Sequence, residues 1–204
     1  MSDEVIIRGG LPTGAEDVAA ALYWEAFGTK LARVLGPRER ALAFILRVMR
    51  SDQCLAALSP SGALLALAGI KTAEGVFVDG GLRDLAAVYG LLGALWRAAA
   101  LALLERPLAP GVLLMDGIAE AGGARGMGIG TMLLDAVEAE ARRRGLGSVR
   151  LDVIDTNPKA RALYERRGYL VSGQERLGPF RALFGFAAAT TMIKRLPRGD
   201  ADAA

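Results

Sequence analysis

The chain has 204 residues, of which 52% are hydrophobic and 23% are charged, a composition typical of folded globular proteins. It contains no histidine and a single cysteine, Cys54. This composition excludes a catalytic imidazole, a His-ligated metal, an internal disulfide and a multi-cysteine zinc site, so we expect no metal site. The net charge of +3 is too small to indicate a nucleic-acid scaffold, and we expect no nucleic-acid partner.

Two segments bear on cellular location. Asp3 and Glu4 stand where a secretory signal would carry bases, and no apolar segment follows them, so we expect a cytoplasmic protein. Residues 85–104 form an apolar run as long as a membrane span. Arg97 near its middle would cost roughly 2.5–3.5 kcal/mol inside a bilayer. We therefore expect a mostly buried core helix and no membrane partner.

Hydrophobic periodicity and turn residues predict alternating strands and helices. The predicted strands are 4–8, 54–58, 63–71, 75–78, 112–119 and 149–154, with terminal strands around Tyr169 and at 190–196. The predicted helices are 13–35, 38–50, 82–104, 128–144 and 158–167. Thr13 is expected to cap the first helix, with Glu16 completing a capping box. This alternation predicts a single domain of the α/β class, or α+β with a mixed sheet, over residues 1–204.

A glycine-rich turn between a predicted strand and a predicted helix carries the clearest chemistry. Its sequence is Arg125-Gly126-Met127-Gly128-Ile129-Gly130-Thr131. Free backbone N–H groups in such a turn, together with the positive end of the following helix, form an anion site suited to phosphate. A P-loop requires Gly-Lys-Ser/Thr and a dinucleotide fingerprint requires G-x-G-x-x-G, and this turn has neither. The pattern that remains is Arg-x-x-Gly-x-Gly.

This pattern resembles the acyl-CoA pyrophosphate loop of the GCN5-related N-acetyltransferase (GNAT) superfamily. A second segment, residues 151–169, resembles that superfamily's strand, Asn, helix, Leu-Tyr and Gly-aromatic sequence, and the two matches together cover residues 118–173. The resemblance implies a mixed, mostly antiparallel twisted sheet flanked by helices. It also implies that the strands at 112–119 and 149–154 are parallel neighbours that splay apart.

The resemblance also implies roles for individual residues. The backbones of Ile118, Ala119 and Glu120 would hold the pantetheine arm and the acyl carbonyl of acetyl-CoA. Asn157 would lie near pantetheine, and Tyr164 near the CoA sulfur. The pyrophosphate would bind at Arg125, Gly126, Met127, Gly128, Ile129, Gly130 and Thr131.

The helix at 82–106 interrupts a region where the superfamily runs nearly from strand to strand. By the same resemblance it is an insertion packed over the sheet. Two roles are open for it: shaping the acceptor pocket, or forming the interface of a homodimer.

Tyr164 also has a chemical argument of its own. A thioester releases a thiolate whose conjugate acid has a pKa of about 8.5, and a phenol with a pKa of about 10 can hydrogen-bond to that thiolate or protonate it. The alternative is that Tyr164 only packs in the core and that Asn157 with Pro158 only caps a helix.

Without histidine, the group that takes the proton of an acceptor amine must be a carboxylate or a water chain. The candidates are Asp116, Glu120 and Glu25. Asp116 and Glu120 would share a face of a regular strand, and Glu120 would face either the acceptor or solvent. Glu25 belongs to the first helix, which in this superfamily borders the acceptor. The alternative for each is a solvated surface acid.

The sequence therefore predicts an N-acetyltransferase that transfers an acetyl group directly from acetyl-CoA to a primary amine of a small molecule or peptide. Cys54 is not expected to carry the acyl group, because it begins a predicted strand and has no histidine partner. The alternatives are a non-catalytic acyl-CoA binding module and, less closely supported, a nucleotide-binding or membrane-associated protein. Residues 142–167 hold eight bases against three acids, which suits the CoA phosphates.

Overall fold

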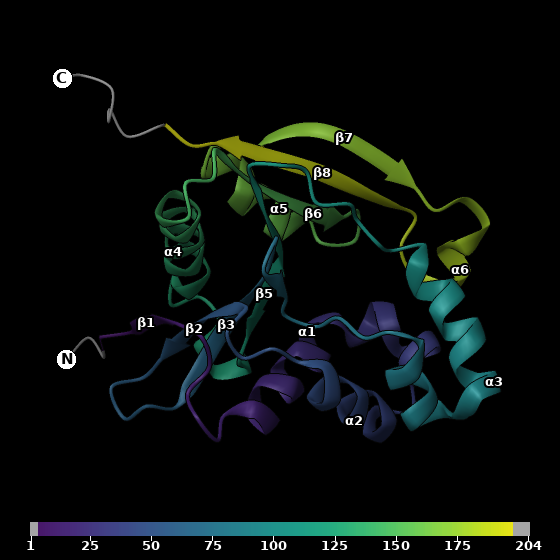
Figure 1. The fold of residues 1–204 in the computed structure, drawn as a ribbon. Coiled ribbons are helices and arrows are strands. Elements are labelled where there is room, and N and C mark those ends of the chain that lie inside the picture. Colours follow the sequence, from purple (N-terminus) through teal and green to yellow (C-terminus); the bar gives the residue numbers. More distant parts are fainter. Residues whose placement is uncertain (1–3, 198–204) are drawn as a thin grey trace.

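An eight-stranded sheet forms the centre of the molecule in the computed structural model, which describes residues 4–197 (Figure 1). The strands are β1 (Ile6–Gly9), β2 (Cys54–Leu58), β3 (Leu64–Thr72), β4 (Gly75–Val76), β5 (Val112–Glu120), β6 (Ser148–Ile154), β7 (Leu170–Arg176) and β8 (Ala188–Arg195). Their order is β1-β2-β3-β5-β6-β8-β7, and β4 pairs with β3. β5 and β6 are parallel, and every other pair among the described strands is antiparallel. The predicted mixed, mostly antiparallel sheet is confirmed.

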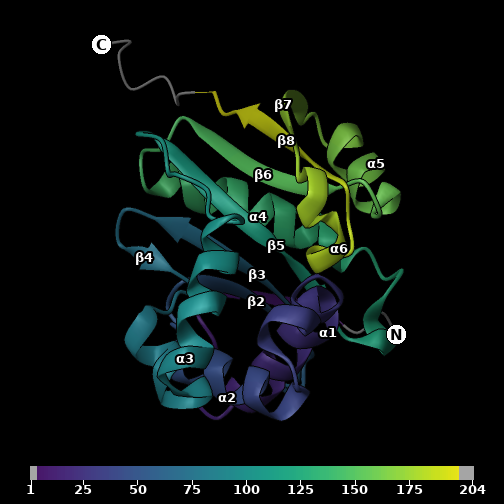
Figure 2. The same ribbon diagram turned by 90° about the vertical axis from the view of Figure 1, so that its right-hand side faces the viewer.

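Helices cover both faces of this sheet (Figures 1 and 2). They are α1 (Glu16–Leu35), α2 (Arg38–Val48), α3 (Leu82–Ala102), α4 (Ile129–Arg143), α5 (Pro158–Arg166) and α6 (Arg181–Phe184). α4 and α5 pack on one face, where Leu133 and Tyr164 join a core with Met115. α1 packs on the other face, where Leu22 joins a second core with Ala119. α2, α3 and α6 extend the layer that α1 begins.

Most predicted boundaries agree with the structure, but three local details differ. The predicted Thr13 cap is wrong: the residue that caps α1 is Ala15, because a turn closed by the Ala15 N–H on the Pro12 carbonyl places Thr13 before the helix. β4 ends at Val76, two residues earlier than expected. The short helical segments at Gly178–Phe180 and Arg181–Phe184 have no counterpart in the prediction.

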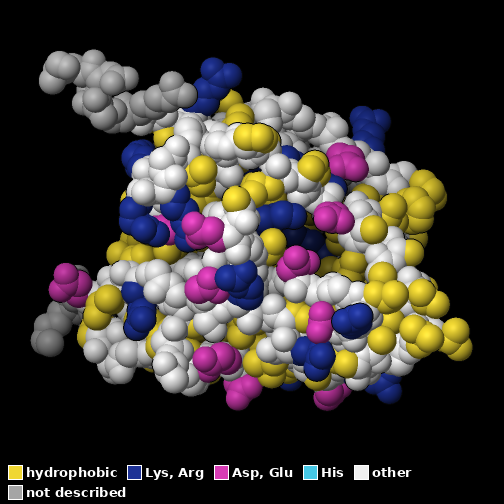
Figure 3. Space-filling model, viewed as in Figure 1, with side chains coloured by type: hydrophobic (Ala, Val, Ile, Leu, Met, Phe, Trp, Pro, Cys, Tyr) yellow, Lys and Arg dark blue, Asp and Glu magenta, His cyan; other side chains and the backbone are white. Residues whose placement is uncertain are grey.

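α3 is much more exposed than the sequence suggested. Leu91, Leu92, Leu95 and Trp96 are between 44% and 84% exposed. Figure 3 shows hydrophobic side chains gathered over α3 at the right edge of the molecule. The expectation of a mostly buried helix is therefore wrong, because α3 buries only the side that carries Leu85 against its neighbours. A homodimer formed through the exposed side stays a prediction.

Within residues 4–197, α3 is the helix whose length and composition would allow it to cross a membrane. Gly90 has φ 72° and ψ 165°, outside the helical region, and divides α3 into residues 82–89 and 91–102. At 1.5 Å per residue, the longer part extends about 18 Å, whereas a bilayer core is about 30 Å thick. α3 is thus two short helices joined at Gly90.

β5 and β6 pair only along their first halves. The pairs run from Val112 with Ser148 to Met115 with Leu151. Beyond this point β5 follows β3, whereas β6 follows β8. The prediction that these parallel neighbours splay apart is confirmed, and the second half of β5 is left with a free edge toward β6.

A β-bulge accompanies this separation. Met115 and Gly117 pair with neighbouring residues of β3, so Asp116 between them is the extra residue. Such a bulge bends the strand and re-aims its side chains. Gly117 has φ 148°, and a Cβ at this position would lie 2.8 Å from the Phe27 ring. Only glycine fits at this position, so Gly117 and its close contact with Phe27 hold β5 in its bent course.

Candidate active site

The glycine-rich turn has the geometry of an anion site. Gly126 and Gly128 have φ values of 85° and 79°, which glycine adopts without strain, and Gly128 caps α4. The N–H groups of Gly126, Gly128, Ile129 and Gly130 find no hydrogen-bond acceptor among the described residues. They lie at the N-terminus of a 15-residue helix, whose dipole favours a negative charge. The turn therefore offers several free donors to one anionic group.

The free edge of β5 continues from this turn. Ile118, Ala119 and Glu120 pair on one side with β3. On the side toward β6 they have no strand partner, because the parallel pairing has ended at Met115. Backbone groups on this edge can bind the amides of an extended ligand, as a neighbouring strand would. An elongated molecule with an anionic end thus fits the opening and the turn together.

Tyr164 lies in α5 on the same side of the sheet as this turn. It is only 6% exposed and belongs to the core against which Ile118 and Ala160 also pack. Its hydroxyl has no hydrogen-bond partner within the described chain. Burial, and secondarily the Glu120 carboxylate, raise the pKa of Tyr164 to about 12. The phenol is therefore protonated at neutral pH and able to donate a hydrogen bond.

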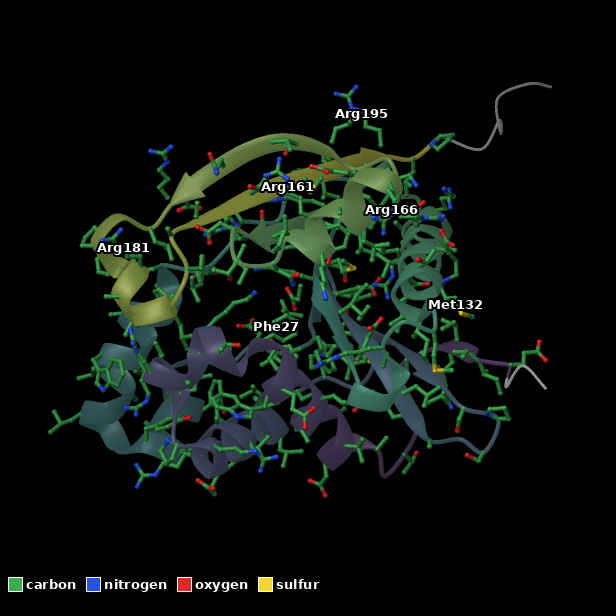
Figure 4. The ribbon with its side chains drawn as sticks, turned by 180° about the vertical axis from the view of Figure 1, so that it is seen from behind. Phe27, Met132, Arg161, Arg166, Arg181 and Arg195 are labelled. Carbon is green, nitrogen blue, oxygen red and sulfur yellow. The ribbon has the colours of Figure 1, made fainter. Side chains whose placement is uncertain are left out.

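Asn157 and the basic residues of α5 frame the same region. Asn157 is exposed, and its Oδ1 accepts a hydrogen bond of 3.1 Å from the Ala160 N–H, so it caps α5. The structure thus shows the expected helix cap, and the contact of Asn157 with pantetheine stays a prediction. Figure 4 shows Arg161 and Arg166 on α5, with Phe27 below them on α1.

Glu120 and Asp116 point to opposite faces of the sheet, so the prediction that they share a face is wrong. The Glu120 Oε1 lies 2.9 Å from the position that a Cβ on Gly130 would take, which places the carboxylate against the start of α4. Asp116 faces the α1 side. The bulge at Asp116 adds one residue between them and inverts the alternation. Glu120 consequently belongs with the anion site.

A cavity of about 470 Å³ lies on the α1 side of the opening, between α1, α3 and the sheet. Asp116 and Asp152, which follow the last paired residues of β5 and β6, both line it. Figure 3 shows acidic and basic side chains around the hollow in the middle of this face. Burial raises the pKa of Asp116 to about 6, while Lys71 and Lys30 oppose the shift. Its carboxylate therefore exchanges a proton near neutral pH, as a general base should.

Two of the three carboxylates proposed as bases are away from this cavity. Glu25 is exposed on the outer side of α1, and Glu120 lies across the sheet. The side of α1 that does line the cavity carries Tyr23 and Lys30. Tyr23, Phe27 and Lys30 follow the i, i+4, i+7 spacing of one helix face, a pattern that the sequence alone contains.

The remaining charges of the cavity are mostly paired. Asp152 accepts a hydrogen bond from the Thr191 hydroxyl and forms an ion pair of 3.7 Å with Arg106. Arg106 also pairs with Glu175 at 2.9 Å, and its backbone carbonyl accepts a hydrogen bond from Lys71. Asp116 differs from these groups, because it has no hydrogen bond or ion pair in the described part of the chain. It remains available to a ligand.

Comparison with known proteins identifies the family to which this chain belongs. The model of the acetyltransferase (GNAT) family matches residues 61–169, more than half of the chain. The protein belongs to this family and is an acyltransferase. A search of curated proteins finds no significant match.

Solved acetyltransferases share the fold. An N-acetyltransferase from Staphylococcus aureus Mu50 has a TM-score of 0.63 at 14% identity, over 95% of this chain and 99% of the other. A GCN5-related N-acetyltransferase from Kribbella flavida has a TM-score of 0.59 at 17% identity, over 94% and 98%. The ribosomal-protein-S18-alanine N-acetyltransferase from Escherichia coli has a TM-score of 0.57 at 14% identity, over 98% and 99%. At these identities the likeness concerns the fold alone.

The position of Glu120 leads to a prediction for CoA binding. A carboxylate beside the first turn of α4 repels a phosphate bound there and competes with it for the free N–H groups. We expect Glu120→Gln to lower the dissociation constant of CoA about three- to tenfold, as measured by isothermal titration calorimetry at low salt.

Glu39→Gln is the matched control, because Glu39 is an exposed acid in the first turn of α2. It should leave CoA affinity unchanged. Weaker CoA binding by Glu120→Gln would contradict this account and would mean that the carboxylate itself holds the ligand.

Proposed function

We propose that the protein is an N-acetyltransferase that transfers an acetyl group from acetyl-CoA directly to a primary amine of a small molecule or peptide. The observation that carries this proposal is the opening between β5 and β6, which has an anion site on one face of the sheet and a cavity with a free carboxylate on the other. A donor and an acceptor bound on the two faces would meet there without a covalent enzyme intermediate.

The chain offers a place for each part of the donor. The turn at Gly126, Gly128 and Gly130 would hold the pyrophosphate, with Arg125, Met127, Ile129 and Thr131 alongside. The edge of β5 at Ile118 and Ala119 would hold the pantetheine arm. Bound acetyl-CoA supplies the acyl group as an activated thioester.

Asp116 would accept a proton from the acceptor amine, and Tyr164 would stabilise the leaving sulfur. An amine arrives as an ammonium, and Asp116 accepts its proton so that the nitrogen has a free electron pair. The nitrogen forms the new C–N bond as the C–S bond breaks, and the sulfur leaves as a thiolate. Tyr164, whose pKa of about 12 lies above that of a thiol, donates a hydrogen bond to the thiolate. The thiolate takes a proton from solvent or from this phenol, and the acylated nitrogen loses its second proton to solvent, which leaves a neutral amide and free CoA.

We also propose that the described chain acts as one acetyltransferase unit, with the α3 region as an insertion that shapes the acceptor site. Leu85, Ala98 and Leu101 of this region line the cavity together with residues of α1 and α2. A cytoplasmic location stays a prediction. Cys54 has no part in the reaction, because it is buried in β2 and burial raises the pKa of its thiol to about 12.

Release of free CoA from acetyl-CoA across a panel of amines tests the proposal. The Tyr164→Phe variant tests the role of the phenol most directly. Loss of the hydroxyl removes the hydrogen bond to the leaving sulfur, so we expect kcat to fall about tenfold or more. The KM for acetyl-CoA should change less than about threefold, since the ring still packs.

Tyr169→Phe is the matched control, because its ring lies 6.0 Å from that of Tyr164 in the same core. It removes a buried hydroxyl whose neighbours include Glu138 of α4, and kcat should be retained. Tight acetyl-CoA binding with no CoA release on any amine would instead favour the non-catalytic binding module.

Asp116 gives a prediction for pH dependence. Below pH 6 its carboxyl is protonated and cannot accept a proton, so kcat at saturating amine should rise with pH and level off above an apparent pKa of about 6. The charges of Lys71, Asp79 and Lys30 also contribute to the pKa of Asp116. We expect Asp116→Asn to lower the plateau about a hundredfold and to abolish this limb. Glu25→Gln should keep the rise of kcat with pH. If Glu25→Gln abolished this rise instead, the base would be Glu25 on α1.

A further inference from the structure

Lys30 is a second partly buried charged group of the cavity that has no ion pair in the described part of the chain. It projects from α1 into the cavity and is partly buried. No hydrogen bond or ion pair to Lys30 occurs within residues 4–197, and Nζ lies 5.1 Å from the centroid of the Phe27 ring. A buried ammonium without a counter-ion is unfavourable. Burial accordingly lowers the pKa of Lys30, and the charges of Asp116 and Asp152 only partly offset this.

Lys30 and Asp116 do not form an ion pair with each other. Both line the same cavity, but no nitrogen–oxygen distance between them is within 4.0 Å. The other main charges of the cavity are held by protein groups: Arg106 by Asp152 and Glu175. Among the partly buried charged groups of the cavity, one cation and one anion therefore lack a partner and lie too far apart to pair directly. Asp79 and Glu105 also line the cavity without an ion pair in the described part of the chain, but both are exposed to solvent.

From this geometry we infer that the acceptor is an amino acid, whose carboxylate binds Lys30 while its ammonium binds Asp116. This inference rests on the proposed acetyl transfer. A zwitterion pairs with both partly buried charges at once, whereas a simple amine would leave Lys30 uncompensated and add a second cation to its surroundings. The carboxylate would also fix the amine on the side of Asp116, which faces the opening where the thioester would lie.

The remaining walls of the cavity indicate the side chain of this amino acid. The walls that α1, α2 and α3 contribute carry Leu31, Leu35, Phe44, Leu85 and Leu101, whereas charged side chains such as Lys71 and Asp79 line other parts of the cavity. A cavity of about 470 Å³ is large enough for a bulky apolar side chain beside the two charged groups. Phenylalanine is therefore a suitable probe, with phenylalaninamide and phenethylamine as analogues that lack the carboxylate.

CoA release with the three probes tests the inference. We expect a kcat/KM for phenylalanine at least tenfold higher than for either analogue. Lys30→Met should lower kcat/KM for phenylalanine at least tenfold, mainly through KM, and change the value for phenylalaninamide less than about threefold. Lys30→Arg should restore most of the preference. Arg33→Met is the matched control, since it removes an exposed charge from the same helix and should change nothing.

The outcomes separate this inference from the proposed function. If acetyl-CoA binds and the analogues are acetylated as well as phenylalanine, the amino-acid inference is wrong and acetyl transfer stands. Failure to bind acetyl-CoA would overturn both. If acetyl-CoA binds but no probe reacts, calorimetry with CoA-saturated protein decides: no binding of phenylalanine at millimolar concentration overturns the inference, whereas binding that Lys30→Met abolishes supports it. Thermal melting of each variant checks that it is folded.

Discussion

The separation of β5 from β6 after Met115 and Leu151 is the constraint on which the rest of the structure depends. Backbone groups in a sheet interior are normally paired, and an unpaired one costs about 1–3 kcal/mol when buried. This fold leaves such groups along the free edge of β5, between two helical layers. The bulge at Asp116 and the contact of Gly117 with Phe27 hold β5 in this course. A ligand that hydrogen-bonds to the free edge of β5 restores the backbone pairing that the sheet lacks there.

The same bulge divides the chemistry between the two faces. Before it, Met115 packs toward α4, and after it, Glu120 points toward α4 while Asp116 turns toward α1. The anion site and Tyr164 therefore lie on one face, and the cavity with Asp116 and Lys30 on the other. The chain needs no histidine for this arrangement, because burial brings the pKa of an ordinary carboxyl to about 6, near that of an imidazole.

Local patterns made the anion site predictable, whereas tertiary contacts decided the acceptor side. The turn around Gly128 and the helix after Asn157 follow from glycine, capping and periodicity within short segments. The opposed directions of Asp116 and Glu120 depend on a bulge between β3 and β5, which no spacing within β5 reveals. The role suggested for Lys30 required knowing which side of α1 faces the sheet. The exposed side of α3 was missed because apolar composition alone does not say whether a helix is covered.

The central claim is that donor and acceptor approach from opposite faces and meet where β5 and β6 part. A crystal structure of the protein with bound CoA tests it most directly. The account predicts the pyrophosphate on the N–H groups around Gly128, the pantetheine along Ile118 and Ala119, and the sulfur near the Tyr164 hydroxyl, with Asp116 across the opening. CoA bound inside the cavity beside Lys30, or away from the opening, would contradict it.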